Sequence, residues 1–377
     1  MDRLTNVIQP YAWGSKELLA RLCGRPPSEM PEAELWMGAH PLAPSRVGNR
    51  TLLEVIEAAP ELTLGPRVVQ RYGRKLPYLL KLLAAAQPLS LQAHPSLRQA
   101  REGYEAENAL GIPLSAAHRN YKDPNHKPEL LCAVTAFKAL CGFRNVAETV
   151  SLFEALGQGG LAARIKVSLK AAFEWLMGLP KPEAVALVEA VIAACQHHTG
   201  RWQDECSNAI ALQKLYPGDV GVVSALWLNF LELKPGEAVY LPAGNLHAYL
   251  GGLGVEVMAN SDNVLRGGLT PKHVDVPELL KVLDFRAGPV SIVHPVQDGE
   301  EEVYVTAASE FRLSRFTLER RSAQPTRRGV EILVCTEGRI TVGSIALRSG
   351  ESVLVSAHEG LYAISGQGVV YRVTVND

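Results

Sequence analysis

A change of hydrophobic periodicity along the chain constrains the fold more than any other feature of this sequence. From residue 1 to about 95, and again from Pro217 onward, apolar runs are short and turn residues recur, which is typical of β-strands. Between about 146 and 215, apolar residues recur at spacings of three and four, which is typical of helices. At about 150 residues per domain, a chain of 377 residues should form roughly two to three domains. We therefore expect two β regions separated by a helical insertion.

Both β regions carry the same spacing of turn residues. In the first region, residues 236–247 read GEAVYLPAGNLH, which has the G-x5-P-x-G-x2-H spacing of the second cupin motif. In the last region, residues 350–361 keep this frame, but Leu361 stands where the first region has His247. Two unrelated hairpins could share such a spacing. We interpret the pattern instead as two cupin-like domains, of which only the first keeps the imidazole.

These observations favour a mainly β fold class, in which two cupin-like jelly-roll β domains accompany an inserted α-helical subdomain. An apolar content of 47% over this length is ample for burying a large core. The predicted parts are the first part of a catalytic cupin domain (1–145), a helical insertion (146–216), the second part of the catalytic cupin domain (217–285) and a C-terminal cupin-like β domain that lacks metal ligands (286–377).

The charge and the cysteines exclude several classes of protein. Lysine and arginine total 38 and aspartate and glutamate total 39, so the chain lacks the positive field with which proteins hold nucleic acid or anionic membranes. The six cysteines form no C-x-x-C pair, and the N-terminal residues lack a basic stretch followed by an apolar run. The most apolar stretch, residues 76–93, is interrupted by Lys81, Gln87 and Pro88 and does not predict a membrane span. We therefore expect a cytoplasmic protein with reduced cysteines that binds neither nucleic acid nor a membrane.

The segment PLSLQAHP, residues 88–95, predicts a strand with one polar face. Its period of two places Ser90, Gln92 and His94 together on that face. A histidine beside another donor can form half of a metal site, because both side chains can converge on one ion. A structural histidine held by a hydrogen bond fits the segment equally well.

The segment YKDPNHKPELLCAV, residues 121–134, gathers charged residues before an apolar, strand-like run. Alternation places Lys127 and Glu129 on one face, with Asp123 and His126 just upstream, so an acid, a base and a cation arrive together. A solvated turn that enters a strand explains the same residues, because prolines and an asparagine interrupt the charges.

The segment GVEVMANSDNVLRGGLTPKHV, residues 254–274, joins an alternating strand to a Ser-Asp-Asn turn. Glu256 and Met258 share one face of the strand, and Arg266 in its glycine-flanked loop can approach a ligand closely. The pattern indicates an oxyanion-binding loop. An ordinary hairpin with exposed cations is the alternative.

His247 follows the Pro-x-Gly turn that, in the cupin pattern, delivers an imidazole into the mouth of the barrel. The match is partial, since the asparagine that the pattern expects four residues later is Gly251. A histidine of the core or of an interface is the alternative interpretation.

Several of these segments together resemble the type I phosphomannose isomerase family. The resemblance rests on YKDPNHKPE at residues 121–129 and on HAYLGGLGVEVMANSDNVLRGGLTPK at residues 247–272, which look like two signature stretches of that family. Supporting matches are YAWGSK (11–16), ELWMGAHP (34–41) and QAHP (92–95). One departure is Gly267, where the family usually has alanine; it could loosen the loop but leaves Arg266 in place.

The resemblance implies an enzyme, a zinc-dependent aldose–ketose isomerase that interconverts mannose 6-phosphate and fructose 6-phosphate through an enediol. It implies one Zn²⁺ per chain, bound by Gln92, His94, Glu129 and His247. Two imidazoles, a carboxylate and an amide oxygen suit this borderline metal. The implied partner is a small-molecule sugar phosphate, and proteins of this type are often monomers.

The catalytic residues that the resemblance implies are Lys127, Asp262, Arg266 and His126. Of these, Lys127 and Asp262 would act near the C1–C2 proton, His126 in ring opening, and Arg266 at the enediolate or the phosphate. His126 and Glu256 also remain candidates for the base. The implied substrate-binding residues are Ser90, Lys81, Lys272, Glu256 and Tyr249. Lys81 has the alternative of extending from an apolar strand towards water.

Two other classes of function compete with the isomerase. An Fe(II) oxygenase would use a two-histidine, one-carboxylate site, but Gln92 as a fourth protein ligand argues against it because oxygen activation needs open positions. A non-catalytic cupin that binds sugar phosphates would be expected to lose Lys127, Asp262 or Arg266 while keeping the fold. All three residues are present.

Overall fold

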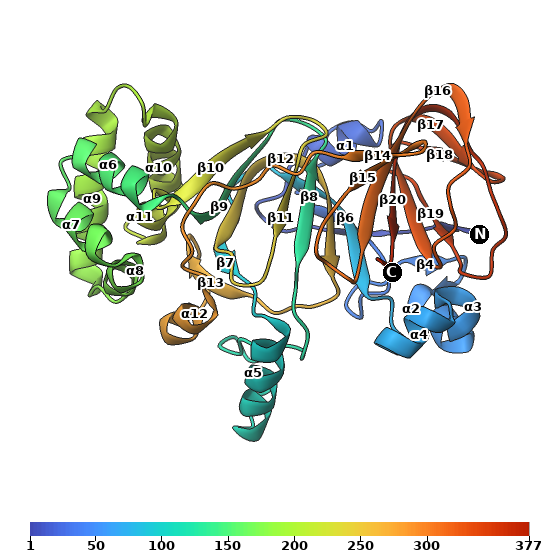
Figure 1. Ribbon diagram of the computed structural model, residues 1–377, viewed down its shortest axis with the longest axis horizontal. Helices are drawn as coiled ribbons and strands as arrows, with labels where there is room; N and C mark the ends of the chain where they lie inside the picture. The colour runs from blue at the N-terminus through green and yellow to red at the C-terminus, as the bar shows by residue number, and fades with distance from the viewer. Residues whose placement is uncertain (377) are drawn as a thin grey trace.

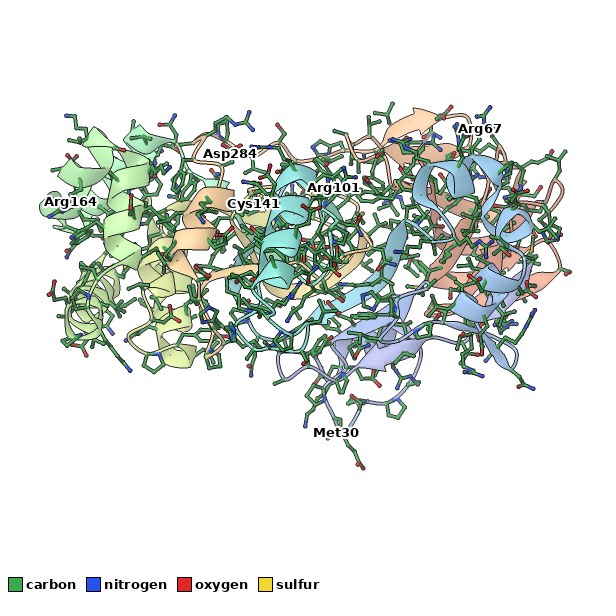
Figure 2. The ribbon with its side chains drawn as sticks, turned by 90° about the horizontal axis from the view of Figure 1, so that it is seen from below. Met30, Arg67, Arg101, Cys141, Arg164 and Asp284 are labelled. Atoms are coloured by element: carbon green, nitrogen blue, oxygen red, sulfur yellow. The ribbon has the colours of Figure 1, made fainter. Side chains whose placement is uncertain are left out.

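The computed structural model describes residues 1–376, and Figure 1 shows three parts in a row along its long axis. Helices occupy one end, a first β barrel lies in the middle and a C-terminal β barrel lies at the other end, beside the N-terminus. Figure 2 shows the same row from below, with Arg164 near one end, Cys141 in the middle and Arg67 towards the other end. The helices at the first end are α6 (Val146–Ala155), α7 (Gly159–Val167), α8 (Leu169–Met177), α9 (Lys181–His197), α10 (Gln203–Leu215) and α11 (Gly221–Ala225).

The first barrel is built around the long strand β12, which pairs antiparallel with β7 and β9 through its first residues and with β6 and β8 through its second half. This arrangement matters for the predicted site because β12 begins at His247, a predicted metal ligand, and continues to Glu256 further along the barrel. The strands of this sheet are β2 (Val7–Gln9), β3 (Glu34–Met37), β6 (Tyr78–Ala85), β7 (Leu91–Ala93), β8 (Glu129–Ala133), β9 (Phe137–Phe143), β10 (Leu228–Leu233), β11 (Ala238–Leu241), β12 (His247–Ala259) and β13 (Leu265–Gly268).

The C-terminal sheet includes one strand from the very start of the chain, because β1 pairs antiparallel with β19. The range 1–145 that the sequence predicts for the first part of the catalytic domain therefore contains a strand of the other sheet. The members of this sheet are β1 (Asp2–Leu4), β14 (Val296–Asp298), β15 (Glu301–Tyr304), β16 (Arg312–Ala323), β17 (Glu331–Val342), β18 (Ile345–Arg348), β19 (Ser352–Val355) and β20 (Ile364–Thr374).

The two barrels repeat one another in strand order. Neighbouring strands of the first barrel run β2-β3-β6-β12-β8-β11, and those of the second run β14-β15-β16-β20-β17-β19. Gly236 and Gly350, which open the two copies of the spaced motif, both have a positive φ and stand two residues before β11 and β19. The predicted fold class, two cupin-like jelly rolls with a helical insertion, is confirmed.

The shorter helices connect and cover the barrels. Helices α2 (Leu52–Ala58) and α5 (Leu97–Ala109) each begin with a capping box, from Thr51 and Ser96 respectively. Helices α2 to α4 pack with the second barrel, since Leu64 and Val68 share a buried core with Phe311. The other short elements are α1 (Leu18–Leu22), α3 (Pro60–Leu64), α4 (Pro66–Tyr72), α12 (Val276–Val282), β4 (Arg46–Val47) and β5 (Arg50–Thr51).

The helical part begins with α6, which Asn145 caps with its side chain. Its helices extend to α11, whose residues 221–225 lie beyond the predicted boundary at 216. The six cysteines are free thiols, five of them buried. Across residues 1–376, no helix combines the length and the apolar character needed to cross a membrane.

Candidate metal centre

Three strands of the first barrel bring a carboxylate and two imidazoles together. His247, the first residue of β12, pairs with Gln92 of β7, and Glu129, the first residue of β8, pairs with Met258 further along β12. His94 follows β7 directly. One donor atom from each of His94, Glu129 and His247 lies within 4.8 Å of the others, and all three residues are buried. These are the residues that could hold a metal ion.

Backbone carbonyls fix both imidazoles in the same tautomer. His94 Nδ1 lies 2.7 Å from the carbonyl oxygen of Asn263, and His247 Nδ1 lies 3.0 Å from that of Asn245. A carbonyl oxygen only accepts hydrogen bonds, so in the neutral ring each Nδ1 carries the proton and each Nε2 keeps its lone pair. The Nε2 atoms of His94 and His247 lie 3.4 and 3.3 Å from the carboxylate oxygens of Glu129. The centre therefore presents two imidazole lone pairs to one carboxylate.

Two atoms of this cluster lack the partners that buried polar atoms normally have. Among residues 1–376, His94 Nε2 and Glu129 Oε2 find no hydrogen-bond partner although they are buried, which is costly unless a ligand completes them. The amide of Gln92 lies 3.4 Å from His247 Nε2 and, turned about its last bond, offers an oxygen to the same point. Nitrogen and oxygen donors in this mixture suit Zn²⁺. The residues present therefore fit the predicted zinc cofactor.

The electrostatics of the centre keep its donors in the forms that bind metal. Burial lowers the pKa of His94 to about 4, so the imidazole is neutral near pH 7. Burial alone would raise the pKa of Glu129, but the neighbouring side chains of His94, Lys127 and His247 outweigh it and hold this pKa well below its usual range. A neutral imidazole and an ionised carboxylate are the states that coordination requires.

Gln92 and Glu129 reach the wall of a cavity of about 520 Å³, a size suited to a small ligand. The cavity is lined by carboxylates, cations and aromatic side chains from both halves of the first barrel. Most of the residues that the sequence predicts for the site also line it. These residues are Lys81, Ser90, Gln92, Lys127, Glu129, Tyr249, Glu256, Asp262, Arg266 and Lys272.

A network of buried charges crosses the barrel beside this cavity. Lys81 Nζ lies 3.0 Å from a carboxylate oxygen of Glu256 and 3.4 Å from one of Glu34. Burial alone would lower the pKa of Lys81, but these two carboxylates overcome it and raise the pKa. Burial raises the pKa of Glu256, which also accepts a hydrogen bond of 2.9 Å from the hydroxyl of Tyr249. The charge of Lys81 is therefore balanced within the protein.

The groups suited to proton transfer reach the cavity from two loops. Lys127 Nζ lies 3.2 Å from Glu129 Oε1, and the Lys127 side chain is 10% exposed. Asp262 belongs to the Ser-Asp-Asn turn and donates its backbone N–H to Asp123 over 2.8 Å, which joins the two signature segments. Arg266 of β13 pairs directly with Gln92, so both side chains lie on the same face of the sheet.

His126 is the predicted site residue that the structure places apart. It does not line the cavity, and its Nε2 lies 2.8 Å from Glu310 Oε1 in the second barrel. Its position three residues before Glu129 made it a reasonable candidate in the sequence. The contact with Glu310 depends on the packing of the two barrels, which the sequence pattern does not reveal.

Sequence reasoning missed several residues that line the cavity. Glu34 and Trp36 stand on one face of β3, and the Trp36 indole donates to Glu34 over 2.6 Å. His40 follows this strand, and its Nε2 lies 3.2 Å from Asp262 Oδ1. The sequence did contain a signal for these residues, since the segment ELWMGAHP at residues 34–41 is one of the matches to the family. That match, however, did not assign a role to any single residue of the segment. Tyr216 of the helical part also lines the cavity.

The fold and the site define a metal-binding cupin with a polar, sugar-sized cavity. Residues 1–146 match the family model described as "Phosphomannose isomerase type I, catalytic domain". The chain is 41% identical to the mannose-6-phosphate isomerase of Escherichia coli (strain K12), over 99% of each chain. It is 32% identical to the mannose-6-phosphate isomerase of Bos taurus, over 95% of this chain and 94% of the relative. The chain belongs to the type I phosphomannose isomerase family.

Solved structures resemble the whole chain. A crystal structure of mannose 6-phosphate isomerase bound with zinc and yttrium covers 100% of both chains, with a TM-score of 0.92 and 39% identity. The apo form of mannose 6-phosphate isomerase from Salmonella typhimurium has a TM-score of 0.94 and 39% identity, over 100% of this chain and 99% of that one. The likeness therefore includes the helical part and both barrels.

Proposed function

We propose that this chain is a zinc-dependent isomerase that interconverts mannose 6-phosphate and fructose 6-phosphate through an enediol. One observation carries the proposal. His94 and Glu129 present buried donor atoms that have no partner in the described part of the chain, and Glu129 also reaches the wall of a cavity lined by acids, bases and cations. Relatives that carry the name mannose-6-phosphate isomerase support this choice of substrate.

The phosphate of the substrate needs local cations, because the net charge of the chain is only −1. We assign it to Ser90, Arg266 and Lys272, which line the cavity. The ammonium of Lys81 was also predicted to bind phosphate, but it is balanced by Glu34 and Glu256. We therefore assign Lys81 to the orientation of these carboxylates, with Glu256 and Tyr249 close to the sugar.

The isomerisation moves one proton from C2 of the open-chain aldose to C1, while a proton passes between the two oxygens. A base must take the first proton, and a hydrogen-bond donor must stabilise the negative charge that develops on oxygen. We assign the proton transfers to Lys127 and Asp262 and the stabilisation of the enediolate to Arg266. We assign no catalytic step to His126, because its imidazole is hydrogen-bonded to Glu310.

The metal would be held by His94, Glu129 and His247 together with the amide of Gln92. When bound, Zn²⁺ supplies Lewis acidity at the sugar oxygens. The residues of the chain supply the rest, since they bind the phosphate, carry the proton and surround the reacting carbons with a largely buried wall. No cofactor for hydride transfer is needed for this reaction.

Removal of the metal tests the proposal. Dialysis against a chelator should lower kcat for fructose 6-phosphate formation by at least about 100-fold, because a metal ion supplies several kcal/mol of charge stabilisation. Added Zn²⁺ should restore it. The measurement couples fructose 6-phosphate formation to a dehydrogenase, with metal analysis of each sample and circular dichroism to check that the fold persists. Full turnover of the metal-free protein would contradict the proposal.

We further propose that the enzyme acts as a monomer in the cytoplasm. The six free cysteines suit a reducing compartment. Sedimentation of the purified protein, compared with a monomer mass of 40.9 kDa, tests the oligomeric state. Fractionation of cells that produce the chain tests the location.

A further inference from the structure

We propose that His40 is a positioning residue that aims the carboxylate of Asp262 into the cavity. His40 lies in the loop after β3, and Asp262 lies in the turn after β12, so the two residues are 222 positions apart in the sequence and meet only in the fold. This inference rests on the proposed function, because it concerns one of the groups to which we assign proton transfer.

The hydrogen bonds of His40 select one tautomer. Its Nδ1 accepts a hydrogen bond of 3.3 Å from the backbone N–H of Leu42, so in the neutral ring the proton is on Nε2. Nε2 lies 3.2 Å from Asp262 Oδ1, which is hydrogen-bonding distance. The imidazole therefore donates to the carboxylate whether it is neutral or charged, and Asp262 accepts in its ionised form.

The surroundings hold His40 still. Its side chain is 3% exposed, whereas that of Asp262 is 43% exposed. The ring packs edge-on against Trp36, with a distance of 4.7 Å between the ring centroids. The loop that carries it is closed by Ser45, whose N–H donates to the carbonyl of Gly38 and whose hydroxyl accepts from the N–H of Gly38. A rigid, buried imidazole can thus fix a carboxylate that would otherwise move freely at the cavity wall.

The ionisation of Asp262 agrees with this arrangement. Burial alone would raise the pKa of Asp262, but the hydrogen bond and charge of His40 and the charges of Lys127 and Lys81 lower it overall. The turn itself is anchored from the other side, where Asp123 accepts from both the Asp262 N–H and the Ser261 hydroxyl. Asp123 sets the position of the backbone, and His40 sets the direction of the side chain.

A double-mutant cycle with a conservative rescue tests the role of His40. The variants are His40→Leu, His40→Gln, Asp262→Asn and the double variant His40→Leu/Asp262→Asn, each with Zn²⁺ bound. Misplacement of a reacting group by about 1 Å costs up to about 100-fold in rate, so we expect kcat of His40→Leu to fall about 10- to 100-fold with little change in KM. A glutamine amide can donate from nearly the same place as Nε2, so His40→Gln should recover most of the lost kcat.

The two halves of the cycle separate a positioning role from a purely structural one. In the Asp262→Asn background, His40→Leu should change kcat by less than about twofold, because the group through which it acts is already gone. An equal loss in both backgrounds, or no recovery with glutamine, would overturn the inference. If Asp262→Asn alone keeps full kcat, the inference fails, while dependence on zinc still tests the isomerase proposal independently.

Discussion

At the scale of single residues, Asn263 connects the two signature segments more than any other side chain of the turn. Its amide Nδ2 donates to the carbonyls of Asp123 and Asn125, over 2.7 and 2.8 Å, and its Oδ1 accepts from the N–H of Lys122 over 2.6 Å. Its own carbonyl holds Nδ1 of His94. One fully buried residue therefore orients both a metal ligand and the segment that leads to Lys127.

Replacement of Asn263 by alanine should weaken both the fold and the metal site. The change leaves several partly buried backbone groups without their partner, so we expect the free energy of unfolding to fall by up to roughly 3 kcal/mol. The loss of support behind His94 should weaken zinc binding by about 10- to 100-fold. Urea denaturation and competition with a zinc chelator measure the two effects.

Asn260→Ala is the matched control, since this asparagine lies in the same turn and, within residues 1–376, makes hydrogen bonds only through its backbone. It should leave both measurements nearly unchanged. Equal zinc affinity of Asn263→Ala and the intact protein would show that the carbonyl of residue 263 is held without the side chain.

The sequence predicted those site residues whose partners lie in the same strand or in a recognisable segment. Alternation paired Lys127 with Glu129, and the structure places their charged atoms 3.2 Å apart. It did not predict the pairing of His40 with Asp262, because that contact requires β3 to lie beside β6 and β6 beside β12. Contacts between distant strands depend on sheet order, which a local pattern does not contain.

At the scale of elements, the end of β13 shows how the helical part supports the cavity. Gly268 has a φ of +120°, and a Cβ there would lie 2.7 Å from the Cα of Gly221, the first residue of α11. Asp219, just before that helix, accepts from the N–H of Thr270 over 3.3 Å. Residues 269–272, which line the cavity, therefore pack close to the first residues of α11.

Gly268→Ala should therefore disturb the cavity, whereas Gly267→Ala should not. At Gly268 the positive φ and the close backbone contact both oppose a side chain, with a cost of about 1–3 kcal/mol for the backbone strain alone. At Gly267 a new Cβ would meet only side-chain atoms, the nearest being Leu246 Cδ1 at 3.2 Å. We expect Gly268→Ala to lower thermal stability and raise KM for the sugar phosphate. Unchanged values for Gly268→Ala would mean that α11 can move away.

The elements themselves were predictable to different degrees. The helical stretch and the β texture came from periodicity, because residues 146–215 and the two barrels are long enough for a pattern to repeat. The placement of β1 beside β19 was not predictable, since three residues carry almost no pattern and their partner lies about 350 positions away. Helix α11 was not predicted for a similar reason, because five residues are too few to show a helical period.

At the scale of the whole molecule, the two barrels face each other through polar contacts as well as a shared core. Glu310 of the second barrel is 8% exposed and accepts from His126 in the first, over 2.8 Å. Burial alone would raise the pKa of Glu310, but the hydrogen bond and charge of His126 lower it overall. A carboxyl pKa that is lower in the folded state stabilises the protein above the unfolded pKa, which is about 4.3, and this contribution is lost as the pH falls further.

Glu310→Gln should reveal this contribution through its dependence on pH. The variant keeps the shape but loses the charge, so we expect the free energy of unfolding at pH 7 to fall by about 1 kcal/mol. The difference from the intact protein should shrink as the pH falls below about 4. Urea denaturation at the two pH values measures it, with the exposed Glu319→Gln as control. A difference that stays constant with pH would contradict an ionic contribution.

When the strand registers of the two barrels are aligned, buried residues of the C-terminal barrel correspond in position to residues of the metal site and of the charge network beside it. Glu331 pairs with β19 and β20 as Glu129 pairs with β11 and β12. By the same register Arg372 corresponds to Glu256 and Ser314 to Lys81. The second barrel thus keeps a buried carboxylate at the ligand position, but it meets a guanidinium instead of imidazoles, with Arg372 Nε 2.9 Å from Glu331 Oε2.

Arg372→Met should therefore destabilise the molecule without removing its zinc chemistry. Arg372 and Glu331 are fully buried, and Arg372 also lies 2.8 Å from Glu301, so the change takes one cation away from two buried carboxylates, which keep Arg327 and Arg312 as partners. Breaking a buried pair costs up to about 3–5 kcal/mol, and the double variant Arg372→Met/Glu331→Gln should recover part of it because one of the two carboxylate charges is then removed. Urea denaturation measures the stability, and zinc content with kcat per folded molecule should stay near the values of the intact protein. If the single variant lost its zinc while still folded, the cluster would be coupled to the metal centre through the shared core, and the second barrel could not be regarded as an independent structural support.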